Sequence, residues 1–284
     1  MSLLKIFTKR QIEEVKSIRA KHPLAQDIFS KMHLYKGVSE YESRLIELVD
    51  YFGYEKGAKA HFCRIYGGEA MPIREKLGLS LVEMMIMNMY ASFNRMSPDR
   101  QDMYYIFDYI VKKAEATFGK RENISVVDFG CGLGQIGIAF CLAGFPVYFV
   151  DVREEFLQFT EFLCSKRKIK NYKIVQHNDL RTYPSMDIFN QPVRVIIEWS
   201  SFEHFYNPLT AFTWVKDLLV PKGLFVSTTA VLNWTDQFKE EIILDAGERA
   251  YNILSSEEYT NLSKKYFAVE SPTGSIAKLL IKKP

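Results

Sequence analysis

The chain has 284 residues, of which 48% are apolar and 25% are charged, and its formal net charge is +3. This composition is typical of a soluble globular protein with one large or two ordinary domains, and the small charge gives no indication of a nucleic-acid partner. No apolar run approaches the roughly 18 to 20 residues of a membrane-spanning helix, and the first residues lack the apolar stretch and cleavage site of a signal peptide. We therefore expect a cytoplasmic protein with no membrane contact.

The four cysteines, at positions 63, 131, 141 and 164, form no C-x-x-C pair and have no spacing typical of a zinc site. We expect them to be reduced thiols, since disulfides are rare in the cytoplasm. The sequence accordingly predicts no bound metal.

Residues 1–120 are expected to form a helical region, because they contain no convincing alternating strand. Apolar residues recur at helical spacing over 45–52, and further helices are predicted over 79–90 and 102–118. Such a region could cover a ligand site as a lid, or serve as an assembly module such as a homodimer interface.

Residues 121–284 have a different pattern, in which short β-rich runs alternate with helical segments. This alternation is typical of βαβ units and a parallel sheet. Near the end, the runs 266–269 and 277–281 lie on either side of a turn around Pro272 and Gly274. We expect these runs to form a closing hairpin.

The most informative segment is the glycine-rich run that follows an apolar strand, Asp128-x-Gly130-x-Gly132-x-Gly134. Glycine permits positive φ and a close approach of the backbone, because it has no Cβ. The helix that starts after such a turn presents unpaired N–H groups. The segment therefore predicts a turn that binds a nucleotide-like ligand.

Two kinds of ligand are compatible with the glycine spacing, a dinucleotide and a cationic amino-acid cofactor. Gly132-x-Gly134-x-x-Gly137 matches the dinucleotide fingerprint, and Asp151 follows Gly132 by nineteen residues, near the spacing expected for a ribose-binding acid. Asp128 favours the other ligand, since a carboxylate there would repel a pyrophosphate but would pair with the ammonium group of an amino-acid cofactor. A dinucleotide-dependent oxidoreductase is thus the weaker alternative.

With Asp128 and the glycines that follow it, the chain resembles motif I of the class I S-adenosylmethionine-dependent methyltransferases. The resemblance continues in order through Pro146–Asp151, Lys173–Leu180, Val193–Pro208 and Leu218–Ser227, and covers roughly residues 121–284. It implies an α/β fold with a doubly wound, seven-stranded, mostly parallel sheet, preceded here by the helical region. It also implies methyl transfer from S-adenosyl-L-methionine to a hydroxyl or amine of a small molecule.

The resemblance further implies which residues bind the donor. Asp128 would meet its ammonium group, Asp151 its ribose hydroxyls and Asp179 its adenine amino group. The full implied set is Asp128, Gly130, Gly132, Gly134, Gln135, Asp151, Val152, Asn178, Asp179, Leu180 and Trp199.

Catalytic residues are harder to identify, because a sulfonium donor is already activated and the protein mainly has to align the acceptor and remove a proton. His204 is one candidate base, since an ordinary histidine titrates near neutrality, and Glu198 is a second. Tyr90 and Arg95 are candidates for the lid over the acceptor. A non-catalytic protein that keeps the donor pocket and binds a partner through the helical region is the alternative from another class.

Overall fold

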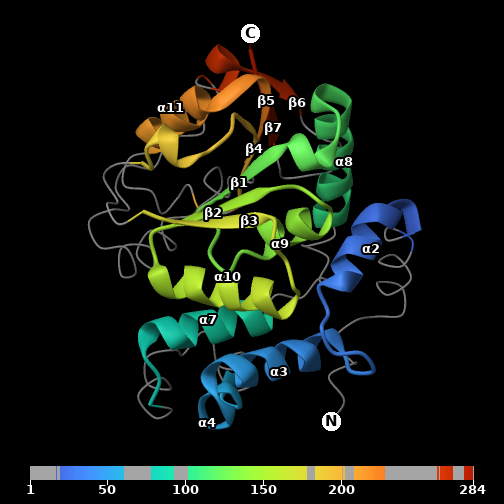
Figure 1. Cartoon of the computed structure of the whole chain (residues 1–284), viewed down its shortest axis with the longest axis vertical. Coiled ribbons are helices and arrows are strands. Elements are labelled where there is room, and N and C mark those ends of the chain that lie inside the picture. Colours follow the sequence, from blue (N-terminus) through green and yellow to red (C-terminus); the bar gives the residue numbers. More distant parts are fainter. Residues whose placement is uncertain are drawn as a thin grey trace. The chain divides into compact units, whose positions relative to one another are not determined.

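The computed structural model contains helices and strands from near the beginning of the chain to near its end (Figure 1). No helix among the described residues is both long and apolar enough to cross a membrane. The described residues are 17, 20–60, 78–92, 102–177, 183–199, 201, 208–227, 261, 263–270 and 278–283.

The chain divides into two compact units. One comprises Met1–Asp108 together with Gln158–Lys168, and the other comprises Tyr109–Leu157 together with Ile169–Pro284. This division falls within α8 (Asp102–Phe118), and a short segment from the middle of the chain belongs with the N-terminal helices. The domain boundary near residue 120 stays a prediction.

The second unit is built on a seven-stranded sheet with the strand order β3-β2-β1-β4-β5-β7-β6. β1 to β5 pair in parallel, whereas β7 lies antiparallel to both β5 and β6. This confirms the expected sheet and its closing hairpin. The strands are β1 Ser125–Phe129, β2 Val147–Asp151, β3 Tyr172–Gln176, β4 Val193–Glu198, β5 Leu219–Ser227, β6 Phe267–Glu270 and β7 Lys278–Lys282.

The strand order reverses between β1 and β4, because β2 and β3 lie on one side of β1 while β4 and β5 lie on the other. In open parallel sheets, ligands bind outside the carboxyl ends of the strands at such a switch point. The turns after β1, β2 and β4 are therefore the place to look for a site.

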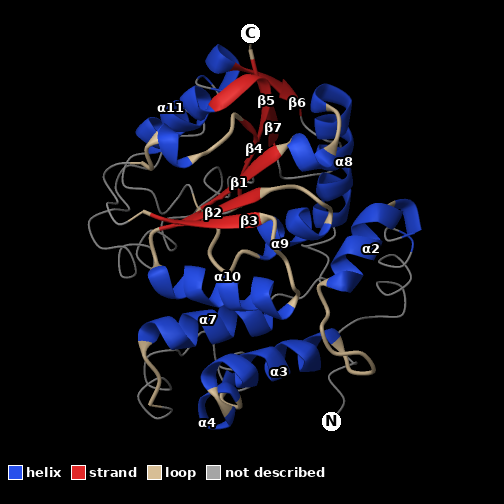
Figure 2. Cartoon of the chain, viewed as in Figure 1, coloured by secondary structure: helices blue, strands red, loops and turns tan. Residues whose placement is uncertain are grey.

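Helices cover the sheet, which explains why β1 is buried along its whole length. α9 (Gln135–Leu142) packs on β1 and β2, and α11 (Pro208–Leu218) packs on β5 (Figure 2). The core beside α11 is aromatic: the rings of Phe129 and Trp214 have centroids 4.5 Å apart. The predicted helix over 102–118 is confirmed as α8, Asp102–Phe118, and α10 spans Glu154–Lys166.

The first unit contains helices α2 (Pro23–Lys31), α3 (Glu40–Phe52), α4 (Tyr54–Gly57) and α7 (Leu81–Ser92). α3 contains the apolar face predicted over 45–52, and α7 confirms the helix predicted over 79–90 with a shift of two residues. α3 begins at a capping box, in which Ser39 and Glu42 bond to each other's backbone N–H groups.

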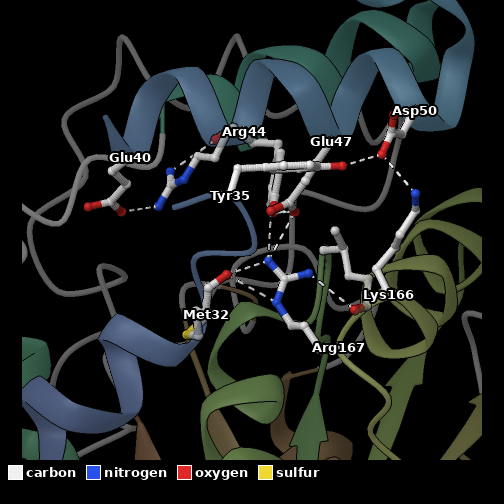
Figure 3. Close-up of polar contacts among 10 residues, drawn as sticks. Met32, Tyr35, Glu40, Arg44, Glu47, Asp50, Lys166 and Arg167 are labelled. Atoms are coloured by element: carbon white, nitrogen blue, oxygen red, sulfur yellow. Dashed lines mark hydrogen bonds and ion pairs between the residues drawn. The ribbon is translucent and has the colours of Figure 1, made fainter. Parts of the chain in front are cut away.

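The second half of α10 belongs to this first unit because its side chains pack among the N-terminal helices. The ring of Phe159 meets Tyr51 and Tyr90 edge-on, with centroids 4.9 and 5.0 Å away. Just after the helix, the Arg167 guanidinium donates to the Glu47 carboxylate at 2.9 Å and to the Met32 carbonyl at 2.6 Å (Figure 3). Aromatic packing and a buried ion pair therefore hold residues 158–168 in the helical unit.

Candidate active site

The turn after β1 requires the glycines that the sequence places there. Gly130, Gly132 and Gly134 all have positive φ, at 67°, 51° and 63°, a region that residues with a Cβ rarely adopt. Gly134 is the N-cap of α9 and supplies no side-chain cap, so the first N–H groups of this helix depend on other partners. The alternating glycines thus produce the close-approach turn that the sequence predicts.

Asp128 lies in β1 and is 3% exposed. Its Oδ2 accepts a hydrogen bond from the backbone N–H of Gly137 in α9 at 2.9 Å. A Cβ on Gly137 would meet the Phe149 ring and lie 2.8 Å from the same carboxylate oxygen, so a glycine at this position allows α9 to pack closely on the sheet.

Burial raises the pKa of Asp128 to about 7, although the Gly137 N–H opposes this rise. The nearby carboxylates of Asp151 and Glu198 raise the pKa further, because like charges disfavour ionisation. The carboxylates at the ends of β2 and β4 thus act on Asp128 at the switch point of the sheet. A ligand with positive charge would relieve this repulsion.

Asp151 ends β2, and backbone N–H groups hold its carboxylate in place. Oδ2 accepts from Gly132 at 2.8 Å and Oδ1 accepts from Arg153 at 3.0 Å. Burial raises the pKa of Asp151, while these N–H groups act against that rise. The sequence prediction that Asp151 and the glycine turn share one site therefore agrees with a direct contact between them.

Gln135, Val152 and Trp199 also lie at these strand ends. Gln135 is the first residue of α9, and its Oε1 is buried without a hydrogen-bond partner in the described part of the structure. A buried amide oxygen of this kind is costly unless a ligand or water bonds to it. Val152 follows β2 and Trp199 follows β4, and both are partly buried.

Only some of the candidate catalytic and lid residues lie among the residues that the structure describes. Glu198 ends β4 and is fully buried, with its carboxylate bonded to Ser201 and Ser227. Tyr90 lies in the helical unit, where it is 3% exposed and its hydroxyl donates to Glu47. His204, Arg95 and the segment Asn178–Asp179–Leu180 fall outside the described residues. The roles assigned to all of these residues stay predictions.

Sequence reasoning missed the two serines that bond to Glu198. Ser201 comes shortly after β4 and is 7% exposed, and Ser227 is the fully buried last residue of β5. Serines occur widely in turns, and neither position carries a motif. The alternation within β5 gives no signal either, because five consecutive residues at its end are buried.

Comparison with known proteins identifies the family. A family model described as a methyltransferase domain matches residues 99–266. The chain belongs to this methyltransferase family. It is therefore an enzyme domain, and the sequence resemblance to the class I type implies S-adenosylmethionine as its methyl donor. No curated protein matched the methyltransferase.

Solved structures with a similar fold include the CurJ carbon methyltransferase, at 12% identity and a TM-score of 0.54. That match covers 99% of this chain and 94% of the CurJ chain, so the similarity in fold extends over the N-terminal helical region of this chain. Two further matches have 20% identity. They are an S-adenosylmethionine-dependent methyltransferase from Aquifex aeolicus (60% and 87% covered, TM-score 0.42) and a protein from Pyrococcus horikoshii (66% and 92%, TM-score 0.45).

The described residues of the methyltransferase fit this donor. Its positive charge suits a site with one buried and one partly buried carboxylate, Asp128 and Asp151, which both have raised pKa values. The glycines at positive φ leave the backbone accessible to it, and Gln135 offers an unused acceptor.

Proposed function

We propose that the protein transfers a methyl group from S-adenosylmethionine to a hydroxyl or amine of a small molecule. The assignment of the donor site is supported chiefly by the contact between the Asp151 carboxylate and the Gly132 N–H. The buried carboxylate of Asp128 lies at the same switch point. The small-molecule acceptor is supported by the low net charge of +3 and by the sequence after β4, where Asn207-Pro208-Leu209 differs from the Asn-Pro-Pro-Tyr motif used on nucleic-acid bases.

Each part of the site has a distinct role in this proposal. Asp128 holds the ammonium group of the donor, Asp151 holds the ribose hydroxyls, and the glycine turn allows the backbone to approach. S-adenosylmethionine supplies an activated methyl group when bound. The protein then has to align the acceptor atom and take its proton, a role for which His204 is the candidate.

The proposal is tested by donor binding and by transfer. Thermal shift with S-adenosylmethionine, S-adenosylhomocysteine and NAD should show stabilisation by the first two only, since ligands stabilise the state that binds them. Transfer of a labelled methyl group should then be measured against a panel of small alcohols, phenols and amines. Stabilisation by NAD alone would favour the oxidoreductase, whereas donor binding without transfer to any acceptor would favour the non-catalytic alternative.

A carbon acceptor is the second candidate, because one of the solved structures with a similar fold, which matches nearly the whole chain, is a carbon methyltransferase. The two possibilities predict different products. With a ¹³C-methyl donor, the carbon chemical shift of the product distinguishes a methyl group on oxygen, nitrogen or carbon, so one spectrum of a turned-over acceptor decides between them.

A further inference from the structure

Glu198 is a fully buried carboxylate at the carboxyl end of β4, and both of its oxygens are bonded to the protein. Oε1 accepts from the Ser201 backbone N–H at 2.6 Å and lies 3.2 Å from Ser201 Oγ. Oε2 accepts from Ser227 Oγ at 2.7 Å. Glu198 and Ser227 are direct neighbours in the register of β4 and β5. The side chain therefore links its own strand to the next one.

Ser201 extends this linkage to a third strand. Its hydroxyl lies 3.0 Å from the carbonyl oxygen of Phe129, the last residue of β1. The carboxyl ends of β1, β4 and β5 are adjacent in the sheet, and this set of contacts connects all three. Asp128 immediately precedes Phe129, so the linkage lies beside the carboxylate assigned to the donor.

The same geometry disfavours Glu198 as a proton acceptor in catalysis. A general base must come within hydrogen-bond reach of the proton that it removes, but Glu198 is 0% exposed. An ionised carboxylate can only accept hydrogen bonds, and the Ser201 N–H can only donate. The contacts thus suit a group whose function is to accept hydrogen bonds from donors in the protein itself.

We infer that Glu198 is a positioning residue, which fixes Ser201 at the carboxyl edge of the sheet and ties it to Ser227. This inference rests on the proposed function, because Trp199, which directly follows Glu198, belongs to the predicted donor site. In place of proton removal, the carboxylate has a structural role, since it holds the backbone N–H of Ser201 so that the donor meets this edge of the sheet in one arrangement. Buried carboxylates that accept backbone N–H bonds are well suited to this role.

The test compares wild type with Glu198→Gln, Glu198→Ala and Ser227→Ala. Glutamine keeps an oxygen for the Ser201 N–H and an amide that can donate to Ser227 Oγ, whereas alanine removes every contact. NMR-detected amide exchange measures how well the Ser201 N–H is protected, and calorimetry with S-adenosylhomocysteine measures the affinity of the donor site. We expect Glu198→Ala to speed exchange and weaken binding about tenfold or more, because it leaves the buried Ser201 N–H without its acceptor.

In Glu198→Gln both quantities should stay within about threefold of wild type, since neutral hydrogen bonds retain most of the geometry. Ser227→Ala should give a smaller change than Glu198→Ala, because the Ser201 contacts remain. If Glu198→Ala does not fold, Glu198→Met, which has similar length and no acceptor oxygen, is measured with the same expectations.

Two results would overturn the inference. One is unchanged exchange at Ser201 and unchanged binding in Glu198→Ala. The other is a Glu198→Gln variant as impaired as Glu198→Ala, which would show that the charge, and not the hydrogen bonding, matters. Failure of the wild type to bind S-adenosylmethionine or S-adenosylhomocysteine would instead refute the proposed function, and exchange at Ser201 would still decide the role of Glu198.

Discussion

The carboxylate of Asp151, at the end of β2, accepts a hydrogen bond from the backbone N–H of Gly132, in the turn after β1, at 2.8 Å. This contact joins two features that the sequence assigns to the same donor on separate grounds. Its consequence is that the acid and the turn support each other, so a change in either one should affect the binding of the whole donor.

Asp151→Ala should weaken the binding of S-adenosylhomocysteine by about 2 kcal/mol or more, because charge-assisted hydrogen bonds to ribose hydroxyls are lost. Isothermal titration calorimetry measures this directly. Glu155→Ala is the matched control, since Glu155 is an exposed acid in the first turn of α10, and it should bind as the wild type does. Equal affinity of the two variants would remove Asp151 from the site.

Gly132→Val should abolish binding of S-adenosylhomocysteine while the fold persists. Gly132 has a φ of 51°, so a branched side chain there strains the turn and also fills the space that the donor approaches. Gly119→Val is the control for strain alone, because Gly119 has a φ of 87° and open space around its missing Cβ. Circular dichroism and a titration are needed for both variants. Normal binding by Gly132→Val would place the donor elsewhere.

The stability of the ligand-free protein should fall as the pH rises through the range below 7. Asp128 has a pKa of about 7 when folded, against a usual value of 3.8, so between these values the folded state holds a proton that the unfolded state has released. Its free energy of unfolding therefore decreases with rising pH, by up to about 1.4 kcal/mol per pH unit, and levels off above pH 7. Asp151, whose pKa is also raised, acts in the same direction.

Thermal unfolding from pH 5 to pH 8 measures this slope, and the difference between wild type and Asp128→Asn isolates the contribution of one residue. Asp187→Asn is a suitable control, because a hydrogen bond from the Ser185 hydroxyl is the main cause that lowers the pKa of this exposed carboxyl. Its loss should change the slope little and in the opposite sense. Identical slopes for wild type and Asp128→Asn would contradict the raised pKa.

The fold was accessible from the sequence because its determinants are local. The apolar runs that became β1 and β2 are long enough to be buried on both faces, and the glycines at 130, 132 and 134 report a backbone requirement that few other residues can meet. The closing hairpin is predicted by two β-rich runs on either side of Pro272 and Gly274.

The polar contacts between distant segments were not accessible in this way. Arg167 and Glu47 are 120 residues apart. Arg167 stands in the basic run Lys166–Lys170 at the end of α10, and positive residues are common at helix C-termini on dipole grounds alone. The serines that bond to Glu198 likewise carry no motif. Which strands and helices become neighbours depends on the assembled fold, so partners of this kind become visible only once the structure is known.

Arg167→Met should destabilise the protein by about 3–5 kcal/mol, because it leaves the Glu47 carboxylate buried without its cation. Arg167 and Glu47 have side chains that are 4% and 1% exposed, so water cannot replace the lost partner. Lys166→Met is the neighbouring control: its pair with Asp50 is 40% and 29% exposed, and such pairs contribute about 1 kcal/mol or less. Urea unfolding of the three proteins gives the comparison.

A double variant, Arg167→Met with Glu47→Leu, separates the contribution of the ion pair to stability from the destabilisation caused by an unpaired buried charge. Replacing both members of a buried ion pair with apolar side chains is often neutral or stabilising, so the double variant should regain part of the stability that Arg167→Met loses. Recovery will be incomplete, because the Met32 carbonyl loses its donor and the Tyr90 hydroxyl its acceptor. If the double variant is less stable than Arg167→Met alone, the two charges do not act as a pair, and another contact must hold residues 158–168 among the N-terminal helices.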